Sequence, residues 1–185
     1  MDSWAMDLGT TNTGIGYWDK EAQRPRLLEL GSICRKPDGE EQLEAPRLVP
    51  SATHVLPVED FWGKVGKWPW MQKNFFLGKQ GHIGRQALDL NSGEIKPNFS
   101  LTFKPYLGLD PLRHIARVGK DRYTARDVCR IFLRELFSEV KETTGKRVRD
   151  LVITTPVESF ESYRAELTAV TKTLGVKRLR FVDEP

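Results

Sequence analysis

The chain has little of several residues that define common functional classes. Its 185 residues include two cysteines, Cys34 and Cys129, and three histidines. No CxxC pair occurs and no histidines cluster near a cysteine, which argues against a disulfide framework and against a structural zinc site. No apolar run approaches the ~20 residues that span a bilayer, and the N-terminus lacks a basic segment followed by an apolar one. We therefore expect a cytoplasmic protein without a membrane partner.

Two familiar nucleotide-binding motifs are also missing. Neither GxxxxGK[ST] nor GxGxxG occurs, which argues against a P-loop and a Rossmann site. The net charge of +4 comes from 29 basic and 25 acidic residues that are interspersed, so we expect a mixed surface and no nucleic-acid partner. The basic tetrads Lys146–Arg149 and Lys177–Arg180 each precede a predicted strand, and we interpret them as solvated strand entrances.

The C-terminal third has the clearest periodicity. Thr124 and Asp127 resemble a capping box before apolar residues spaced by four, and Gly145 is a typical end for that helix. The apolar run from 148 to 155 predicts a buried strand that Pro156 ends. A second helix, with apolar residues from 160 to 174, and a strand over 178–182 follow. Helix, strand, helix and strand with short links predict a parallel α/β unit.

The N-terminal part predicts a strand, a glycine-rich turn and a second strand between Trp4 and Trp18. A further strand is expected over Leu27–Cys34, then a polar loop from Arg35 to Pro46, and Ser51–Leu56 could form another strand. The tryptophan-rich stretch Phe61–Phe76 is interpreted as an insertion that packs its own small apolar cluster.

The turn Asp7-Leu8-Gly9-Thr10-Thr11-Asn12 is the feature most suggestive of chemistry. A glycine followed by small hydroxyl residues lets backbone amides converge on an anion, and the hydroxyls add donors. A carboxylate beside that anion needs an intervening cation, which suggests Mg²⁺-nucleotide. A plain hairpin turn explains the pattern equally well on these grounds.

Four segments, in order, resemble the actin and DnaK-type heat-shock chaperone superfamily. The first is DLGTTNTGIGYWD, which is similar to the first phosphate loop (D-[LF]-G-T-[TS]-N-[ST]) of these ATPases. RLVPSATHV resembles the segment R-x-x-P-S-x-V, and FSLTFKPYLG resembles F-x-x-K-R-x-[IL]-G. The last segment, from Val148 to Pro185, is similar to the stretch between a V-I-T-V-P strand and an N-E-P tripeptide. The resemblance implies an α/β lobe of the actin-like ATPase (ribonuclease H-like) fold, with a mixed sheet, flanking helices and an inserted side subdomain.

The resemblance also implies roles for individual residues. Gly9, Thr10, Thr11 and Asn12 would contact the β and γ phosphates of ATP, and Asp7 would hold Mg²⁺ through water. Four further residues match positions of known role. Lys104 would position the attacking water, Glu184 would lie near the water shell of the metal and could accept a proton, and Pro156 and Arg164 would relay the nucleotide state outward.

Some positions depart from the chaperone pattern. Asp183 stands where asparagine is usual, and Pro105 follows Lys104 where arginine is usual, which indicates a divergent relative. A second phosphate loop (D-x-G-G-G-T) does not occur in these 185 residues. We therefore expect one lobe of an ATPase, inactive in hydrolysis by itself.

The expected core comprises residues 1–35 and 122–185, and residues 36–121 form the side subdomain. The expected function is that of the N-terminal nucleotide-binding lobe of a DnaK-like chaperone ATPase, with ATP and Mg²⁺ as cofactors. Client polypeptides and co-chaperones would be bound only through further domains. Two alternatives stay open: a lobe of a bacterial actin-like filament protein, and a non-catalytic interaction domain.

Overall fold

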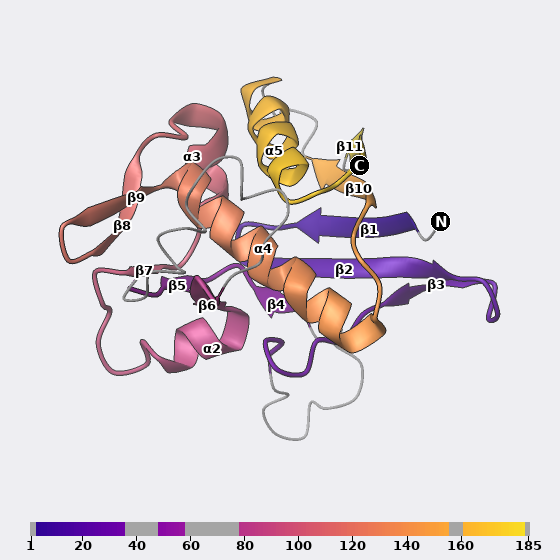
Figure 1. Cartoon of the computed structure of the whole chain (residues 1–185), viewed down its shortest axis with the longest axis horizontal. Helices are drawn as coiled ribbons and strands as arrows, with labels where there is room; N and C mark the ends of the chain where they lie inside the picture. The colour runs from indigo at the N-terminus through magenta and orange to yellow at the C-terminus, as the bar shows by residue number, and fades with distance from the viewer. Residues whose placement is uncertain (1–2, 36–47, 58–77, 156–160, 184–185) are drawn as a thin grey trace.

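The computed structural model describes residues 3–35, 48–57, 78–155 and 161–183 (Figure 1). The predicted tryptophan-rich cluster at Phe61–Phe76 and most of the predicted loop from Arg35 to Pro46 lie outside these ranges.

A mixed six-stranded sheet forms the centre of the molecule. Its strands are β1 (Ser3–Leu8), β2 (Asn12–Asp19), β3 (Arg24–Leu27), β4 (Val49–Pro50), β10 (Asp150–Thr155) and β11 (Arg178–Asp183). The main order is β11-β10-β1-β2-β3, and β4 pairs with β2. β1, β10 and β11 are mutually parallel, whereas β2 is antiparallel to β1, β3 and β4. The predicted hairpin and the predicted parallel unit are both confirmed.

Two helices begin and end near the predicted signals. α4 (Ala125–Thr144) starts with a complete capping box between Thr124 and Asp127 and ends at Gly145, whose φ of 70° is left-handed. Such a C-terminal glycine has no Cβ to strain the turn. α5 (Glu161–Thr173) connects β10 to β11. No helix within the described ranges is long and apolar enough to cross a membrane.

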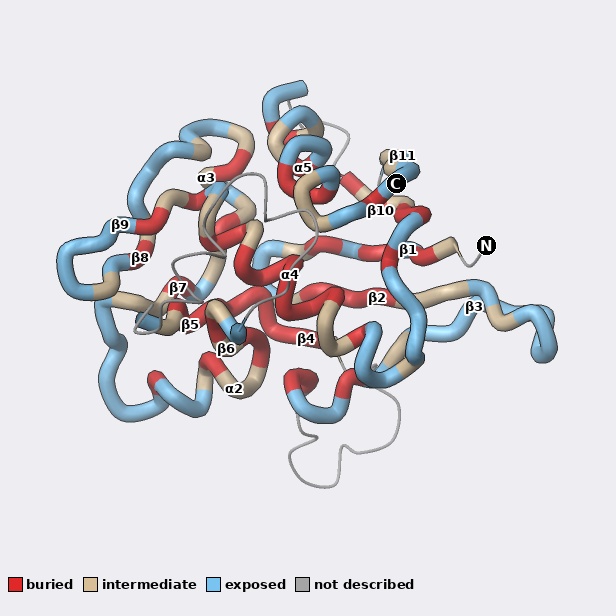
Figure 2. Tube along the Cα trace, viewed as in Figure 1, coloured by how far each residue is buried: buried red, intermediate tan, exposed pale blue. Residues whose placement is uncertain are grey.

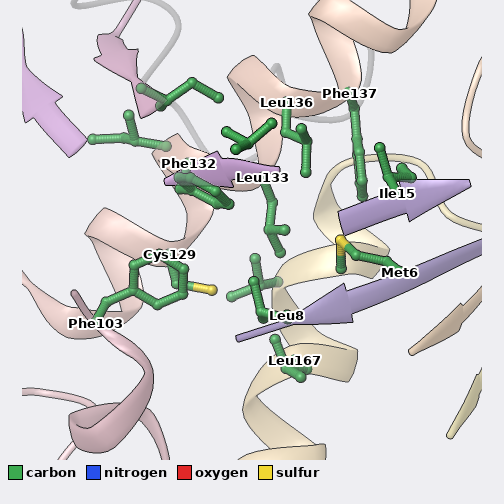
Figure 3. Close-up of a cluster of buried hydrophobic side chains, with 14 of the residues drawn as sticks. Met6, Leu8, Ile15, Phe103, Cys129, Phe132, Leu133, Leu136, Phe137 and Leu167 are labelled. Atoms are coloured by element: carbon green, nitrogen blue, oxygen red, sulfur yellow. The ribbon is translucent and has the colours of Figure 1, made fainter. Parts of the chain in front are cut away.

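Both helices cover the same face of the sheet. Along β1, Trp4, Met6 and Leu8 are buried whereas Ala5 and Asp7 are exposed, because successive side chains of a strand point to opposite faces. Figure 3 shows Met6 and Leu8 in one cluster with side chains of α4 and with Leu167 of α5. In Figure 2, α4, β1 and β2 all carry stretches in the colour of buried residues. Asp7 therefore projects from the face opposite the helices.

Two smaller sheets and two short helices fill the middle of the chain. One sheet contains β5 (Thr53–Val55), β6 (Gly81–Ile83) and β7 (Phe99–Ser100), and the other is the hairpin of β8 (His114–Val118) and β9 (Asp121–Thr124). The short helices are α2 (Gly84–Asp89) and α3 (Lys104–Leu109). Both small sheets contact α4, so this helix joins the side elements to the central sheet.

The predicted strand over Leu27–Cys34 is wrong. β3 ends at Leu27, and the chain then turns, with the amides of Ile33 and Cys34 both donating to the carbonyl oxygen of Leu30 at 2.9 and 2.8 Å. Leu30 and Ile33 are nevertheless buried. Their three-residue spacing places both apolar side chains on one side of a turn, where the sequence pattern had suggested a buried strand.

Candidate functional site

The glycine-threonine turn lies where two parallel strands end. It joins β1 to β2, and β1 pairs in register with β10 so that Asp7 lies opposite Thr154. The hydroxyl of Thr154 donates a hydrogen bond to Oδ1 of Asp7 at 3.0 Å. The turn therefore lies beside the carboxyl end of β10, and Thr154 fixes the direction of the Asp7 carboxylate.

Gly9 is required by the close approach of the backbone within the turn. A Cβ atom at this position would lie 2.2 Å from the carbonyl oxygen of Asn12. No side chain could be accommodated there without opening the hairpin. The tight turn brings the exposed side chains of Thr10 and Thr11 to the end of the sheet.

Ser51 clamps the turn from a distant part of the chain. Its hydroxyl donates to the carbonyl of Gly9 at 2.7 Å, and its amide donates to the carbonyl of Thr11 at 2.9 Å. The same hydroxyl lies 3.1 Å from Oγ1 of Thr13. Ser51 is buried, whereas Thr10 and Thr11 are exposed. The Ser51 clamp thus occupies two carbonyl groups of the turn with hydrogen bonds. It leaves the side chains of Thr10 and Thr11 facing solvent.

Asn12 has a cationic neighbour that the sequence did not reveal. The Nε of Arg35 donates to Oδ1 of Asn12 at 3.2 Å, which turns the amide nitrogen of Asn12 away from Arg35. Arg35 also adds a positive charge beside the turn. No local motif links Arg35 to Asn12, so only the tertiary structure could reveal this contact.

Lys104 is the first residue of α3 and is half-buried. Its neighbours Phe103 and Leu107 are buried, and the hydroxyl of Ser162 on α5 donates to the carbonyl of Gly108 at 2.7 Å. Figure 3 shows Phe103 in one apolar cluster with Leu8, the last residue of β1. The Lys104 backbone is therefore anchored near the end of β1 on the helix-covered face, whereas Asp7 projects from the other face. The expected site brings Asp7 and Lys104 to one cleft, so the Lys104 side chain would have to extend past the end of β1 to reach the face from which Asp7 projects.

Arg164 links the ends of β10 and β11. From α5 its Nη2 donates to the hydroxyl of Thr155 at 3.1 Å and forms an ion pair with Asp183. Its guanidinium carbon also lies 5.7 Å from the ring centroid of Phe181. Pro156 and Glu184 follow Thr155 and Asp183 directly in the sequence but lie outside the described residues. Arg164 thus holds the strand residues that precede both predicted site positions.

Cys129 lies in the apolar cluster near the end of β1 but has no role in chemistry. Its side chain is fully buried, and burial raises the pKa of the thiol, with the negative charge of Glu166 acting in the same direction. A thiol that stays protonated is a poor nucleophile. Cys129 is therefore a packing residue beneath the candidate site.

The fold and the turn together define an α/β domain that presents a threonine-lined loop at the carboxyl end of a mixed sheet. The comparison with protein families then identifies its relatives: the model described as Hsp70 protein matches residues 5–185. The chain belongs to the Hsp70 family, and its fold is that of the actin-like ATPases. It is a chaperone nucleotide-binding domain, of a kind that binds nucleotide with Mg²⁺. A search of curated proteins finds no match.

Proposed function

We propose that Gly9, Thr10, Thr11 and Asn12 bind the β and γ phosphates of Mg²⁺-ATP. The observation that carries this proposal is the Ser51 clamp, which holds the turn by its carbonyls while Thr10 and Thr11 stay exposed. A turn fixed in this way offers hydroxyl donors without having to reorganise when an anion binds. A free hairpin turn would need no buried serine to hold its carbonyls.

Asp7 fits the role of holding Mg²⁺ through water. Its carboxylate is exposed, points away from the helices, and is oriented by Thr154. Mg²⁺ prefers carboxylate and phosphate oxygens and keeps several waters. When bound, the ion would supply positive charge that stabilises the negative phosphate oxygens during phosphoryl transfer.

Lys104 and Glu184 would complete the catalytic set. The rigid anchoring of α3 by buried Phe103 and Leu107 favours Lys104 as the residue that positions the attacking water. A lysine provides a compact charge on a flexible side chain, so it can reach a phosphate from a fixed backbone. Glu184 follows Asp183, which Arg164 holds, and would accept the proton from that water.

Arg164 and Pro156 would relay the state of the nucleotide away from the site. Arg164 contacts both parallel strands that end there, so a change at either strand end would shift α5. In a divergent DnaK-like chaperone with further domains, this shift would couple the nucleotide state to client and co-chaperone binding. Residues 1–35 and 122–185 would form the nucleotide-binding core, and residues 36–121 the side subdomain.

The test is calorimetry with Mg²⁺-ATP on the 185-residue chain, together with a phosphate-release assay. A single phosphate loop should bind Mg²⁺-ATP at about millimolar Kd, which corresponds to about −4 kcal/mol. No turnover above background is expected, because hydrolysis needs donors preorganised around the whole γ-phosphate. The double variant Thr10→Val/Thr11→Val should weaken binding about tenfold or more, because two hydroxyl donors are lost.

A matched control is Thr143→Val, which removes an exposed threonine hydroxyl from α4. It should leave the affinity for Mg²⁺-ATP unchanged. Equal affinity in the control and in the double variant would mean that the turn is only structural, and the non-catalytic interaction domain would then be the better description. Micromolar binding with steady turnover would contradict the idea that this chain supplies one side of a two-sided site.

A further inference from the structure

The two basic tetrads, which are 31 residues apart in the sequence, are neighbours in space. The amides of Lys177 and Arg178 both donate to the carbonyl oxygen of Arg149, at 2.8 and 3.1 Å. β10 and β11 begin side by side, with Asp150 opposite Arg178. We use the term basic end for the six cations that gather where these strands begin: Lys146, Arg147, Arg149, Lys177, Arg178 and Arg180.

The basic end is only partly neutralised. Asp150 is its one buried carboxylate, and it pairs with Arg178 at 2.8 Å and with Arg180 at 3.5 Å. Arg147, Arg149 and Lys177 are exposed, and in the part of the chain that the structure describes their side chains contact no acidic group. These three exposed cations leave the basic end with a positive excess.

An open strand edge adjoins these cations. β11 is the last strand in the order of the central sheet, and within the described ranges no strand pairs with its outer side. None of its residues is buried. Arg178 and Arg180 project from the same face of β11, and their side chains are 61% and 63% exposed. Among the described residues, the outer edge of β11 thus combines backbone groups that pair with no further strand with two arginine side chains at alternate positions.

An open strand edge that carries arginine side chains favours some binding partners over others. A second copy of β11 would place arginine beside arginine when paired in parallel, or in the antiparallel register that puts Arg178 opposite Arg180, and like charges on adjacent strands repel each other. The tetrads contain no aromatic residue on which the bases of a single-stranded nucleic acid could stack. An extended acidic peptide meets both requirements, because carboxylates at every second residue repeat at the same ~6.7 Å spacing as Arg178 and Arg180. Its backbone can also pair with the open edge.

We propose that the edge of β11, together with the basic end, binds an extended acidic segment of a partner polypeptide. The segment adds as a strand beside β11, with alternate carboxylates facing Arg178 and Arg180, and continues past the start of β11 toward Lys177 and Arg149. The nucleotide turn lies at the opposite end of the same strands. The surface is therefore separate from the proposed phosphate site, and a test of one does not depend on the other.

The test uses a fluorescein-labelled peptide of about ten residues that alternates Glu and Thr, long enough to cover β11. Binding to the 185-residue chain is followed by fluorescence anisotropy at low ionic strength. We expect saturable binding that weakens as salt is added, because exposed charges are screened. A peptide that alternates Lys and Thr should not bind. An acidic peptide N-methylated at every second residue should bind much more weakly, because it cannot donate to the edge.

Variants locate the surface on the protein. Arg149→Gln/Lys177→Gln removes two exposed charges without breaking the pairs of Asp150, and it should weaken binding about three- to tenfold. The matched control Arg117→Gln/Lys120→Gln removes the same charge from the exposed β8–β9 hairpin and should have no effect. Amide protection of residues 178–183 should rise when the acidic peptide binds.

Three results would overturn the proposal. The first is equal affinity for the N-methylated and unmodified acidic peptides, which would mean attraction by charge without strand pairing. The second is tighter binding of an oligothymidylate or of phosphatidylserine vesicles than of the acidic peptide. The third is an equal loss of binding in the control variant, which would make net charge the cause.

Discussion

The two ends of the central sheet carry opposite chemistry on the same strands. At the carboxyl end, β1 and β10 present Asp7, Thr154 and the threonines of the turn, which are small polar groups. At the amino end, β10 and β11 begin among six arginine and lysine side chains. The carboxyl end is organised by buried partners such as Ser51, whereas most charges of the amino end are exposed.

This difference shows how one sheet can separate two kinds of binding. A small polar site needs rigidity, because its few donors must stay aligned for a compact ligand. A charged strand edge needs accessibility, because its partner supplies both backbone and side-chain contacts. We therefore expect substitutions at the carboxyl end to affect stability through backbone geometry, and those at the amino end to act through charge.

The largest effect is expected for Gly9→Ala. The added Cβ would lie 2.2 Å from the carbonyl oxygen of Asn12, so the hairpin must open. We expect a loss of about 3 kcal/mol in the free energy of unfolding, the upper range for overpacked sites, measured by urea denaturation. Gly93→Ala is the matched control, because a Cβ there meets nothing within 4 Å. An equally small loss in both variants would show that the carboxyl end is not rigid.

Smaller losses in the free energy of unfolding are expected when one aspartate at each end of the sheet is replaced by alanine. Asp150→Ala at the amino end removes a buried carboxylate that pairs with Arg178 and Arg180. The expected loss in the free energy of unfolding is about 2 kcal/mol, as for hydrogen bonds to charged groups. Asp7→Ala at the carboxyl end removes an exposed carboxylate with one hydroxyl partner and should cost less than about 1 kcal/mol.

Urea denaturation of both aspartate variants provides the measurement. The reverse order of losses would contradict the comparison, because it would make Asp7 a structural residue and Asp150 a surface charge. Such a result would also weaken the proposed role of Asp7 toward Mg²⁺, since a carboxylate needed for folding would be committed to protein contacts.

Much of this fold could be predicted because its signals are local. The capping box at Thr124, the glycine at 145 and the apolar spacing of α4 and α5 lie within single helices, and their interactions involve residues three or four apart. The turn at Gly9 is equally local. The local pattern gave one wrong prediction. Leu27–Cys34 is apolar enough for a strand, but hydrogen bonds to the carbonyl oxygen of Leu30 make it a turn.

The rest of the candidate site depends on contacts between residues that are distant in sequence. The hydroxyl of Ser51 reaches Gly9 across 42 positions, and that of Thr154 reaches Asp7 across 147. Serine and threonine are common residues, so their type alone gave no signal. The gathering of the two basic tetrads was missed for the same reason, because it follows from the parallel pairing of β10 with β11.

The smallest loss in the free energy of unfolding is expected for Asp183→Asn. Asp183 pairs with Arg164 at the carboxyl end, but the two side chains are 55% and 36% exposed. An ion pair screened by solvent to this degree contributes about 0.2–1 kcal/mol, and an asparagine oxygen can still accept a hydrogen bond from Arg164. We therefore expect a loss of about 0.5 kcal/mol, measured by urea denaturation, that disappears in high salt. Thr155 and the ring of Phe181 would still hold Arg164 in place. A loss above about 2 kcal/mol that persists in high salt would instead indicate a desolvated ion pair. The carboxyl end of the sheet would then be stabilised by a buried charge, as the amino end is by Asp150.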